Sequence, residues 1–184
     1  MLAVAGHAEA HSRFLARPVA VVGFMGVGKT TVGRALAELL DRPFVDTDVL
    51  IEQRSGRSIP ELFAEGEPVF RALERRTVLN VLDGPPSVIA LGGGAFAQPA
   101  NTETLLARAL VVHLYTPWSV MVGQLPQLAS TRPLIHSRKP WQVQDLFRAR
   151  AASYRRAHVR VCLPRRDVRE AAGELAEILR IRVP

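Results

Sequence analysis

The segment Gly23-Phe-Met-Gly-Val-Gly-Lys-Thr30 fits the eight-residue phosphate-binding loop pattern, including its final hydroxyl residue. Glycines let such a loop adopt unusual backbone angles and bring successive N–H groups close to phosphate oxygens. In this pattern Lys29 places its charge on the β- and γ-phosphates, and the hydroxyl of Thr30 is available to Mg²⁺. The predicted nucleotide-binding residues are Gly26, Val27, Gly28, Lys29, Thr30 and Thr31.

The sequence on both sides of this loop supports that interpretation. The apolar run 18–23 predicts a buried strand, and Val32, Leu36 and Leu39 recur at helical spacing in the segment that follows. A glycine turn that happens to precede a helix is the alternative, but the motif is expected between a strand and a helix, and both are predicted here. We therefore expect the chain to bind a nucleoside triphosphate.

Beyond the loop, short apolar runs alternate with segments of helical period, which is typical of an α/β fold with a parallel sheet. Further strands are predicted at 43–46, 87–91 and 109–115 and around Val161. Helices are predicted at 49–54, 59–64, 68–82, 141–158 and 168–179, and Ser58 with Glu61 forms a potential capping box. We expect a flexible extension over 1–17, one domain over 18–184, and a mobile, loop-like lid over about 123–140.

Composition limits the function classes. The chain has 184 residues and a net charge of +7, which favours anionic ligands and would suit nucleic acid. We expect no nucleic-acid partner, because no zinc-finger or aromatic RNA-binding pattern is present. No apolar run approaches the roughly 18 to 20 residues of a membrane span, so no membrane association is expected. The single cysteine, Cys162, favours a reducing, cytoplasmic compartment and is expected to be buried.

Polar residues after the later strands supply candidates for an acceptor site. Asp46 and Asp48 follow the second strand, so one carboxylate can serve Mg²⁺ and the other an acceptor hydroxyl. Asp46 could equally be the N-cap of the helix that follows, and both roles can hold at once.

Arg71 and Glu74 stand three residues apart on a predicted helix, where the guanidinium can bind a substrate carboxylate while the acid orients it. A solvated surface ion pair is the alternative. Gly92-Gly93-Gly94 directly follows a strand and lets a ligand approach the backbone, although a plain glycine turn would look the same. Arg132 and Arg150 add cationic groups that could close on phosphate and substrate.

Six segments together, in this order and at this spacing, resemble the shikimate kinase family: the phosphate-binding loop, 44–48 (FVDTD), 70–74 (FRALE), 91–95 (LGGGA), 131–134 (TRPL) and 150–154 (RAASY). The resemblance runs from Val19 to Leu179. It implies a three-layer P-loop kinase fold, similar to nucleoside monophosphate kinases, with a five-stranded parallel sheet. The implied reaction transfers the γ-phosphate of ATP to the 3-hydroxyl of shikimate.

The resemblance also implies roles for individual residues. The catalytic residues would be Lys29, Asp48 and the lid arginine Arg132, with Asp48 polarising the acceptor hydroxyl. Thr30 and Asp46 would hold Mg²⁺, and Arg132 and Arg166 would contact the nucleotide. Shikimate would be bound by Asp48, Arg71, Glu74, Gly92, Gly93, Gly94 and Arg150. One departure is that the segment 123–130 has none of the basic residues that the family commonly carries there.

Two other functions remain open from the sequence. A P-loop kinase of gluconate or of a nucleoside monophosphate would have the same donor site. A nucleotide-binding regulator without catalysis would retain the fold. The set formed by Arg71, the three glycines and Arg150 argues against these other acceptors and favours shikimate. We expect a monomer.

Overall fold

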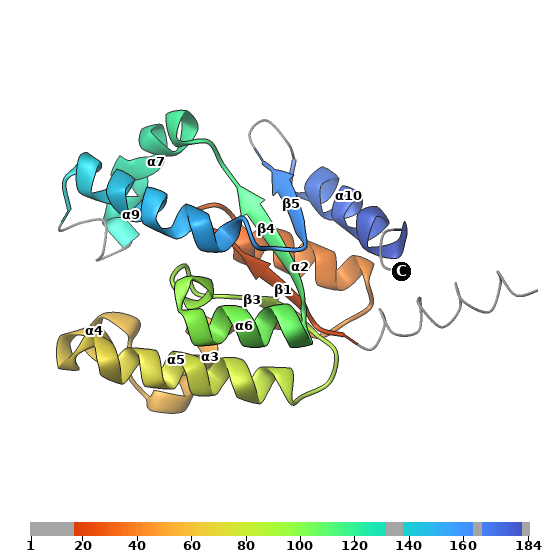
Figure 1. Ribbon diagram of the computed structural model, residues 1–184, viewed down its shortest axis with the longest axis horizontal. Coiled ribbons are helices and arrows are strands. Elements are labelled where there is room, and N and C mark those ends of the chain that lie inside the picture. Colours follow the sequence, from red (N-terminus) through yellow and green to blue (C-terminus); the bar gives the residue numbers. More distant parts are fainter. Residues whose placement is uncertain (1–16, 132–137, 164–166, 182–184) are drawn as a thin grey trace, which may run out of the picture.

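The computed structural model describes residues 17–131, 138–163 and 167–181, and its centre is one parallel sheet (Figure 1). The strands are β1 (Val19–Val22), β2 (Phe44–Asp46), β3 (Val88–Ala90), β4 (Leu110–Tyr115) and β5 (Val159–Cys162). Their order is β2-β3-β1-β4-β5, and every neighbouring pair is parallel. The predicted five-stranded α/β fold is confirmed.

Helices flank this sheet (Figure 1). In the described parts of the chain they are α2 (Lys29–Leu39), α3 (Thr47–Ser55), α4 (Ile59–Glu65), α5 (Glu67–Leu82), α6 (Pro99–Arg108), α7 (Trp118–Thr131), α9 (Pro140–Tyr154) and α10 (Val168–Ile181), with a 3₁₀ turn η1 (Ala95–Ala97). The three central strands are buried between them: β1 and β3 are apolar and inaccessible, and β4 is buried up to Leu114 with His113 as its one buried polar residue, as expected for strands covered on both faces.

The main core joins side chains from the sheet with those of α2 and α10, which pack directly on each other. Along α2, buried Val32 and Leu36 recur at the spacing that places them on one face. A second, smaller cluster of Ile51, Leu62 and Phe70 joins α3, α4 and α5. It fixes the three helices that follow β2 as one unit beside the sheet.

Most predicted elements agree with the structure to within a few residues, and the predicted capping box is confirmed. Ser58 is the N-cap of α4 and accepts a hydrogen bond from the Glu61 amide, while the Glu61 carboxylate accepts from the Ser58 amide. At the end of the expected extension, the Arg17 guanidinium donates to the Ala107 carbonyl oxygen at 2.9 Å. Residues 1–16 lie outside the described part.

Three predictions were incomplete or wrong. Helix α6 was not predicted. The segment from Gly123 was expected to be a loop, but α7 continues to Thr131 with Pro126 inside it; residues 132–137 of the expected lid lie outside the description. Cys162 is exposed and not buried, because it shares a face of the edge strand β5 with exposed Arg160 while Val161 faces the core.

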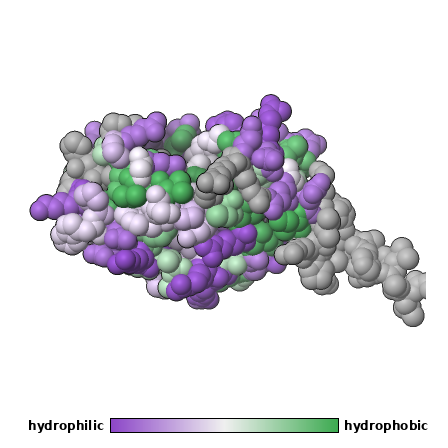
Figure 2. Space-filling view, turned by 90° about the horizontal axis from the view of Figure 1, so that it is seen from above, coloured by the Kyte–Doolittle hydropathy of each residue, from purple (hydrophilic) through white to green (hydrophobic). Residues whose placement is uncertain are grey.

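One face of the molecule carries both hydrophilic and hydrophobic side chains (Figure 2). Seen from above, hydrophilic side chains cover much of it, and hydrophobic side chains gather in patches among them (Figure 2). Among the described helices, none is long and apolar enough to cross a membrane.

Candidate functional site

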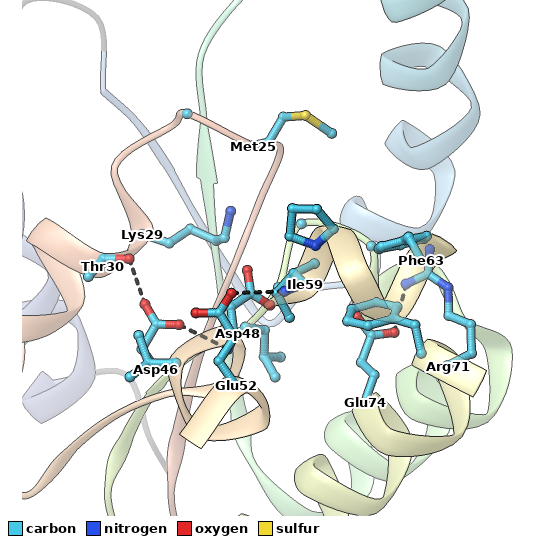
Figure 3. Close-up of a pocket in the computed structure, with 18 of the residues that line it drawn as sticks. Met25, Lys29, Thr30, Asp46, Asp48, Glu52, Ile59, Phe63, Arg71 and Glu74 are labelled. Carbon is cyan, nitrogen blue, oxygen red and sulfur yellow. Dashed lines mark hydrogen bonds and ion pairs between the residues drawn. The ribbon is translucent and has the colours of Figure 1, made fainter. Parts of the chain in front are cut away.

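A cavity of about 810 Å³ opens at the carboxyl edge of the sheet (Figure 3). The loops after β1, β2 and β3 meet there because parallel strands end at the same edge. Most of the residues predicted for donor and acceptor line it: Gly26, Gly28, Lys29, Thr30, Thr31, Asp46, Asp48, Arg71, Glu74, Gly92, Gly93, Gly94 and Arg150. Val27 is buried in the loop, and Arg132 and Arg166 fall outside the described residues.

The donor end of the cavity is the loop between β1 and α2. Gly26 and Gly28 have φ angles of +79° and +91°, in the left-handed region that glycine adopts without strain. Gly28 is also the N-cap of α2, so the positive end of that helix faces the loop. The Lys29 ammonium donates to the carbonyl oxygens of Gly23 and Phe24 at 3.1 and 3.0 Å. The loop therefore presents backbone amides and one ammonium to an anion.

Thr30, Asp46 and Asp48 form a short chain of hydrogen bonds beside this loop (Figure 3). The Thr30 hydroxyl donates to Asp46 Oδ2 at 2.7 Å, and Asp46 Oδ1 accepts from the Asp48 amide at 3.0 Å. Asp46 is thus the N-cap of α3, as the alternative interpretation held, and it also lines the cavity next to Thr30. Hydroxyl and carboxylate oxygens are ligands that suit Mg²⁺.

Arg71 and Glu74 are not a surface ion pair. Glu74 is 1% exposed, and its carboxylate accepts from Arg71 Nη1 at 2.8 Å. Burial raises the pKa of Glu74, and the neighbouring Asp48 carboxylate adds to this, while Arg71 and Arg150 oppose it. Burial also acts on Arg71, but its two carboxylate partners Glu74 and Glu67 outweigh burial, and the pKa of Arg71 is raised. The guanidinium therefore stays charged at the cavity wall.

The glycines after β3 leave space that the charged groups occupy. A Cβ atom on Gly92 would lie 2.5 Å from Asp48 Oδ1, and one on Gly94 would lie 2.9 Å from Arg71 Nη1. At Gly93 the nearest atom would be the Met25 amide nitrogen, at 3.3 Å. The three glycines are therefore more than a turn, because they let a carboxylate, a guanidinium and the donor loop approach one backbone segment.

Arg150 reaches the same segment from α9. Although it is buried, its Nη1 donates to the Gly93 carbonyl oxygen at 2.9 Å, and its guanidinium lies 5.8 Å from the centre of the Phe24 ring. Burial lowers the pKa of Arg150 from its ordinary value, which leaves it a cation at neutral pH. Arg71 and Arg150 thus form two cationic groups around one end of the cavity.

Sequence reasoning missed three polar residues and an apolar wall. One of the three is Glu52, which lines the cavity and accepts a hydrogen bond from the Ile59 amide at 2.8 Å. Thr47 is fully buried and connects the start of α3 to the segment after β3, because its hydroxyl accepts from the Gly92 amide at 3.0 Å. Tyr154 donates its hydroxyl to the Gly93 carbonyl oxygen at 2.6 Å. Ile59, Pro60, Phe63 and Phe70 line the cavity opposite the donor loop. The capping box at Ser58 was the one sequence signal near this wall, since it begins the helix that carries Phe63.

The family model described as "Shikimate kinase" matches residues 25–180. A shikimate kinase of Thermus thermophilus is 38% identical over 163 residues, covering 88% of this chain and 89% of the relative. One of Caulobacter vibrioides is 41% identical over 148 residues, covering 79% of this chain and 74% of the relative.

Solved structures agree. The structure of the shikimate kinase from Acinetobacter baumannii in complex with shikimate is similar at a TM-score of 0.84 and 36% identity, covering 92% of this chain and 96% of that one. A gluconokinase from Sinorhizobium meliloti has a TM-score of 0.60 at 15% identity, so it shares the fold alone. By sequence and structure, the chain belongs to the shikimate kinase family.

Proposed function

We propose that this chain transfers the γ-phosphate of ATP to the 3-hydroxyl of shikimate, giving shikimate 3-phosphate and ADP. The observation that carries the proposal is a cavity shared by the phosphate-binding loop and by Asp48, Arg71 and Arg150. A phosphoryl donor and a carboxylate-bearing alcohol can therefore meet in one enclosure. The similarity to a structure that holds shikimate supports the choice of acceptor.

On the donor side, the loop amides and the N-terminus of α2 bind the phosphates of ATP. The Lys29 ammonium stabilises the negative charge of the transferred phosphoryl group. In the transition state that charge spreads over three oxygens. The lysine's contacts with two loop carbonyls keep its ammonium at the loop. Positioning and charge stabilisation are most of what phosphoryl transfer requires.

On the acceptor side, Arg71 and Arg150 bind the shikimate carboxylate, and Asp48 accepts a hydrogen bond from the reacting hydroxyl. As that oxygen bonds to the γ-phosphorus, the bond to the ADP oxygen breaks and the hydroxyl proton passes to Asp48. The position of Asp48 at the first turn of α3, next to its capping residue Asp46, holds the carboxylate between donor loop and glycine segment.

Thr30 and Asp46 are the residues that would hold Mg²⁺, and the ion would neutralise charge on the β- and γ-phosphates. The paired oxygens at 2.7 Å fit this use. In the described residues no group of three or more His, Cys, Asp or Glu side chains could hold a metal by itself. Mg²⁺ at kinase sites needs only one or two protein oxygens, because phosphates and water complete its shell.

Arg132 is proposed to reach the transferred phosphate from the lid, and Arg166 to contact the nucleotide. The cytoplasmic location, the monomeric state and the absence of a nucleic-acid partner stay predictions from the sequence.

The decisive experiment is an assay coupled to ADP release with shikimate, gluconate and nucleoside monophosphates offered separately. We expect turnover with shikimate only. Turnover with another acceptor and none with shikimate would replace this proposal by a different P-loop kinase. In parallel, Asp48→Ala should keep ATP binding by calorimetry while transfer falls by at least about a hundredfold, in the range known for lost catalytic groups. Normal turnover of that variant would contradict the role of Asp48.

A further inference from the structure

Tyr154, the last residue of α9, shares a hydrogen-bond acceptor with Arg150. The Tyr154 hydroxyl lies 2.6 Å and Arg150 Nη1 2.9 Å from the Gly93 carbonyl oxygen. A carbonyl oxygen has two lone pairs, so these two donors satisfy it completely. Residues four apart lie on the same face of a helix, which explains how both reach one atom.

The Tyr154 side chain has little freedom to move. It is 4% exposed, and its ring stacks on the His113 ring of β4 with centroids 4.9 Å apart and planes at 24°. The Phe96 ring of η1 lies nearly parallel to it, at 6.5 Å. Such ring contacts favour particular ring orientations and stabilise the fold beyond the burial of the rings. The sheet and η1 therefore hold the hydroxyl in place.

Both stacked groups stay in one protonation state near neutral pH. Burial raises the pKa of Tyr154 to about 12, so its hydroxyl remains a donor. Burial lowers the pKa of His113 to about 4, helped by Arg160 and Lys29, so its ring stacks as neutral imidazole.

The Gly93 carbonyl belongs to the planar peptide that continues into Gly94, so fixing the oxygen also fixes the Gly94 amide on the opposite side. That segment is closely packed by the guanidinium groups. A Cβ atom on Gly94 would lie 2.9 Å from Arg71 Nη1 and 3.2 Å from Arg150 Nη2. A rotation of this peptide would therefore displace Arg150.

We propose that Tyr154 is a positioning residue for the acceptor: its hydroxyl, held by the stack on His113, fixes the Gly93 carbonyl on which the Arg150 guanidinium is anchored. The inference rests on the proposed function, because it concerns how the carboxylate of shikimate is bound. It adds a residue that is buried behind the residues lining the cavity.

The test is Tyr154→Phe, which removes the hydroxyl and keeps the ring. We expect the KM for shikimate to rise about three- to tenfold, the range that one lost hydrogen bond produces. The KM for ATP and kcat should change less than about twofold, because carboxylate binding is shared by ground state and transition state. The matched control is Tyr115→Phe, the same deletion at the chain's other tyrosine, whose ring lies under Arg160; its constants should stay unchanged.

A double-mutant cycle tests the route through Arg150. In an Arg150→Lys background the further loss from Tyr154→Phe should be below about twofold, because the group that the tyrosine positions is already altered. Fully additive effects, or an equal rise in the KM for both substrates, would overturn the proposal and leave Tyr154 a packing residue.

A second pair of variants covers the case in which Tyr154→Phe does not fold. His113→Ala removes the stacking partner and keeps the hydroxyl, so the KM for shikimate should rise, and His113→Phe should restore it. An unchanged KM in His113→Ala would overturn the proposal. Failure of the unaltered chain to phosphorylate shikimate would instead refute the proposed function, and that measurement comes first.

Discussion

At the scale of single residues, the acceptor end of the cavity depends on glycines, because their missing side chains leave room for charged groups. Asp48, Glu74 and Arg71 come within 2.5 to 3.3 Å of the positions that Cβ atoms on Gly92 and Gly94 would occupy. Buried charges are tolerated only when paired and hydrogen-bonded. The glycines let these groups pair without forcing the backbone apart.

Gly92→Ala tests this directly. We expect kcat with shikimate to fall at least about tenfold, because the new methyl group meets Asp48 Oδ1 at 2.5 Å and must displace it; misplacing a reacting group by about 1 Å can cost a hundredfold. Gly123→Ala in α7 is the matched control, because nothing lies within 4 Å of its added Cβ. That variant should keep its activity and gain up to about 1 kcal/mol of stability from helix propensity. Equal activity in both variants would contradict the argument.

Glu74→Gln should separate stability from function. The raised pKa of Glu74 means that the folded protein binds this proton more tightly than the unfolded chain does. The stability from that proton is complete below the unfolded pKa near 4.5 and is lost as pH rises through the folded pKa. Glutamine cannot ionise, so the unfolding free energy of Glu74→Gln minus that of the parent should increase between pH 4 and pH 8.

The same substitution weakens the hold on Arg71, so the KM for shikimate should rise about tenfold, as expected for a lost charge-assisted hydrogen bond. Denaturant unfolding at several pH values and steady-state kinetics measure the two effects. Glu67→Gln is the control: Glu67 also binds Arg71, but its side chain is 62% exposed, so both effects should be small. A pH-independent stability difference for Glu74→Gln would refute the assigned shift.

The sequence was informative about the charged residues of the site and silent about what positions them. Asp46 and Asp48 follow a predicted strand, and Arg71 stands three residues from Glu74 on a predicted helix, so chemistry could be expected at these positions. Tyr154 and Gly93 are 61 positions apart, and Thr47 and Gly92 are 45 apart. No local pattern links such pairs, because packing of α9 and of the sheet brings them together.

At the scale of elements, the errors come from helices whose buried faces are unusual. Helix α6 buries Asn101 and Thr102 along with Leu105, so polar residues occupy the face that an apolar pattern would reveal. Asn101 donates to the Ala95 carbonyl oxygen and Thr102 to that of Phe96, which satisfies both side chains in the interior. Helix α7 contains Gly123 and Pro126, which favour a loop, yet it buries Met121 and Leu125 four residues apart. Tertiary packing outweighs propensity in both.

The capping box of α4 gives a prediction at this scale. Helix α4 has 7 residues, too few to be stable alone, so its cap contributes a large share of its stability. Ser58→Ala should lower the unfolding free energy by about 1 kcal/mol and the melting temperature by about 2–4 °C. Ser58→Thr, which keeps a capping oxygen, should recover most of the loss. An unchanged melting temperature in Ser58→Ala would show that α4 is held by Leu62 and Phe63 alone.

At the scale of the whole molecule, the strand order decides where donor and acceptor meet. The sequence indicated five strands but not that β3 lies between β2 and β1. This order inserts the three glycines between the donor loop and the Asp46–Asp48 segment. The register between neighbouring strands, for example Ala20 beside Ile89, depends on how the side chains of both strands pack. The residue pattern of one strand alone does not encode it.

The net charge of +7 should assist substrate capture, because both proposed substrates are anions. A positive field raises the local concentration of anions and their encounter rate, and salt screens it: the Debye length falls from about 30 Å at 0.01 M to about 8 Å at 0.15 M. We therefore expect kcat/KM for shikimate to fall several-fold between these salt concentrations, with kcat changed less than about twofold, since the paired charges inside the cavity are screened less. Steady-state kinetics at fixed pH and saturating ATP measure this. Exposed Arg148, on α9, is a suitable site for testing the contribution of one surface charge, because its ion pair with Asp145 is long at 4.0 Å and largely solvated. Arg148→Gln should reduce the salt dependence of kcat/KM slightly and leave kcat unchanged. If kcat/KM does not respond to salt, the excess positive charge has no part in substrate capture.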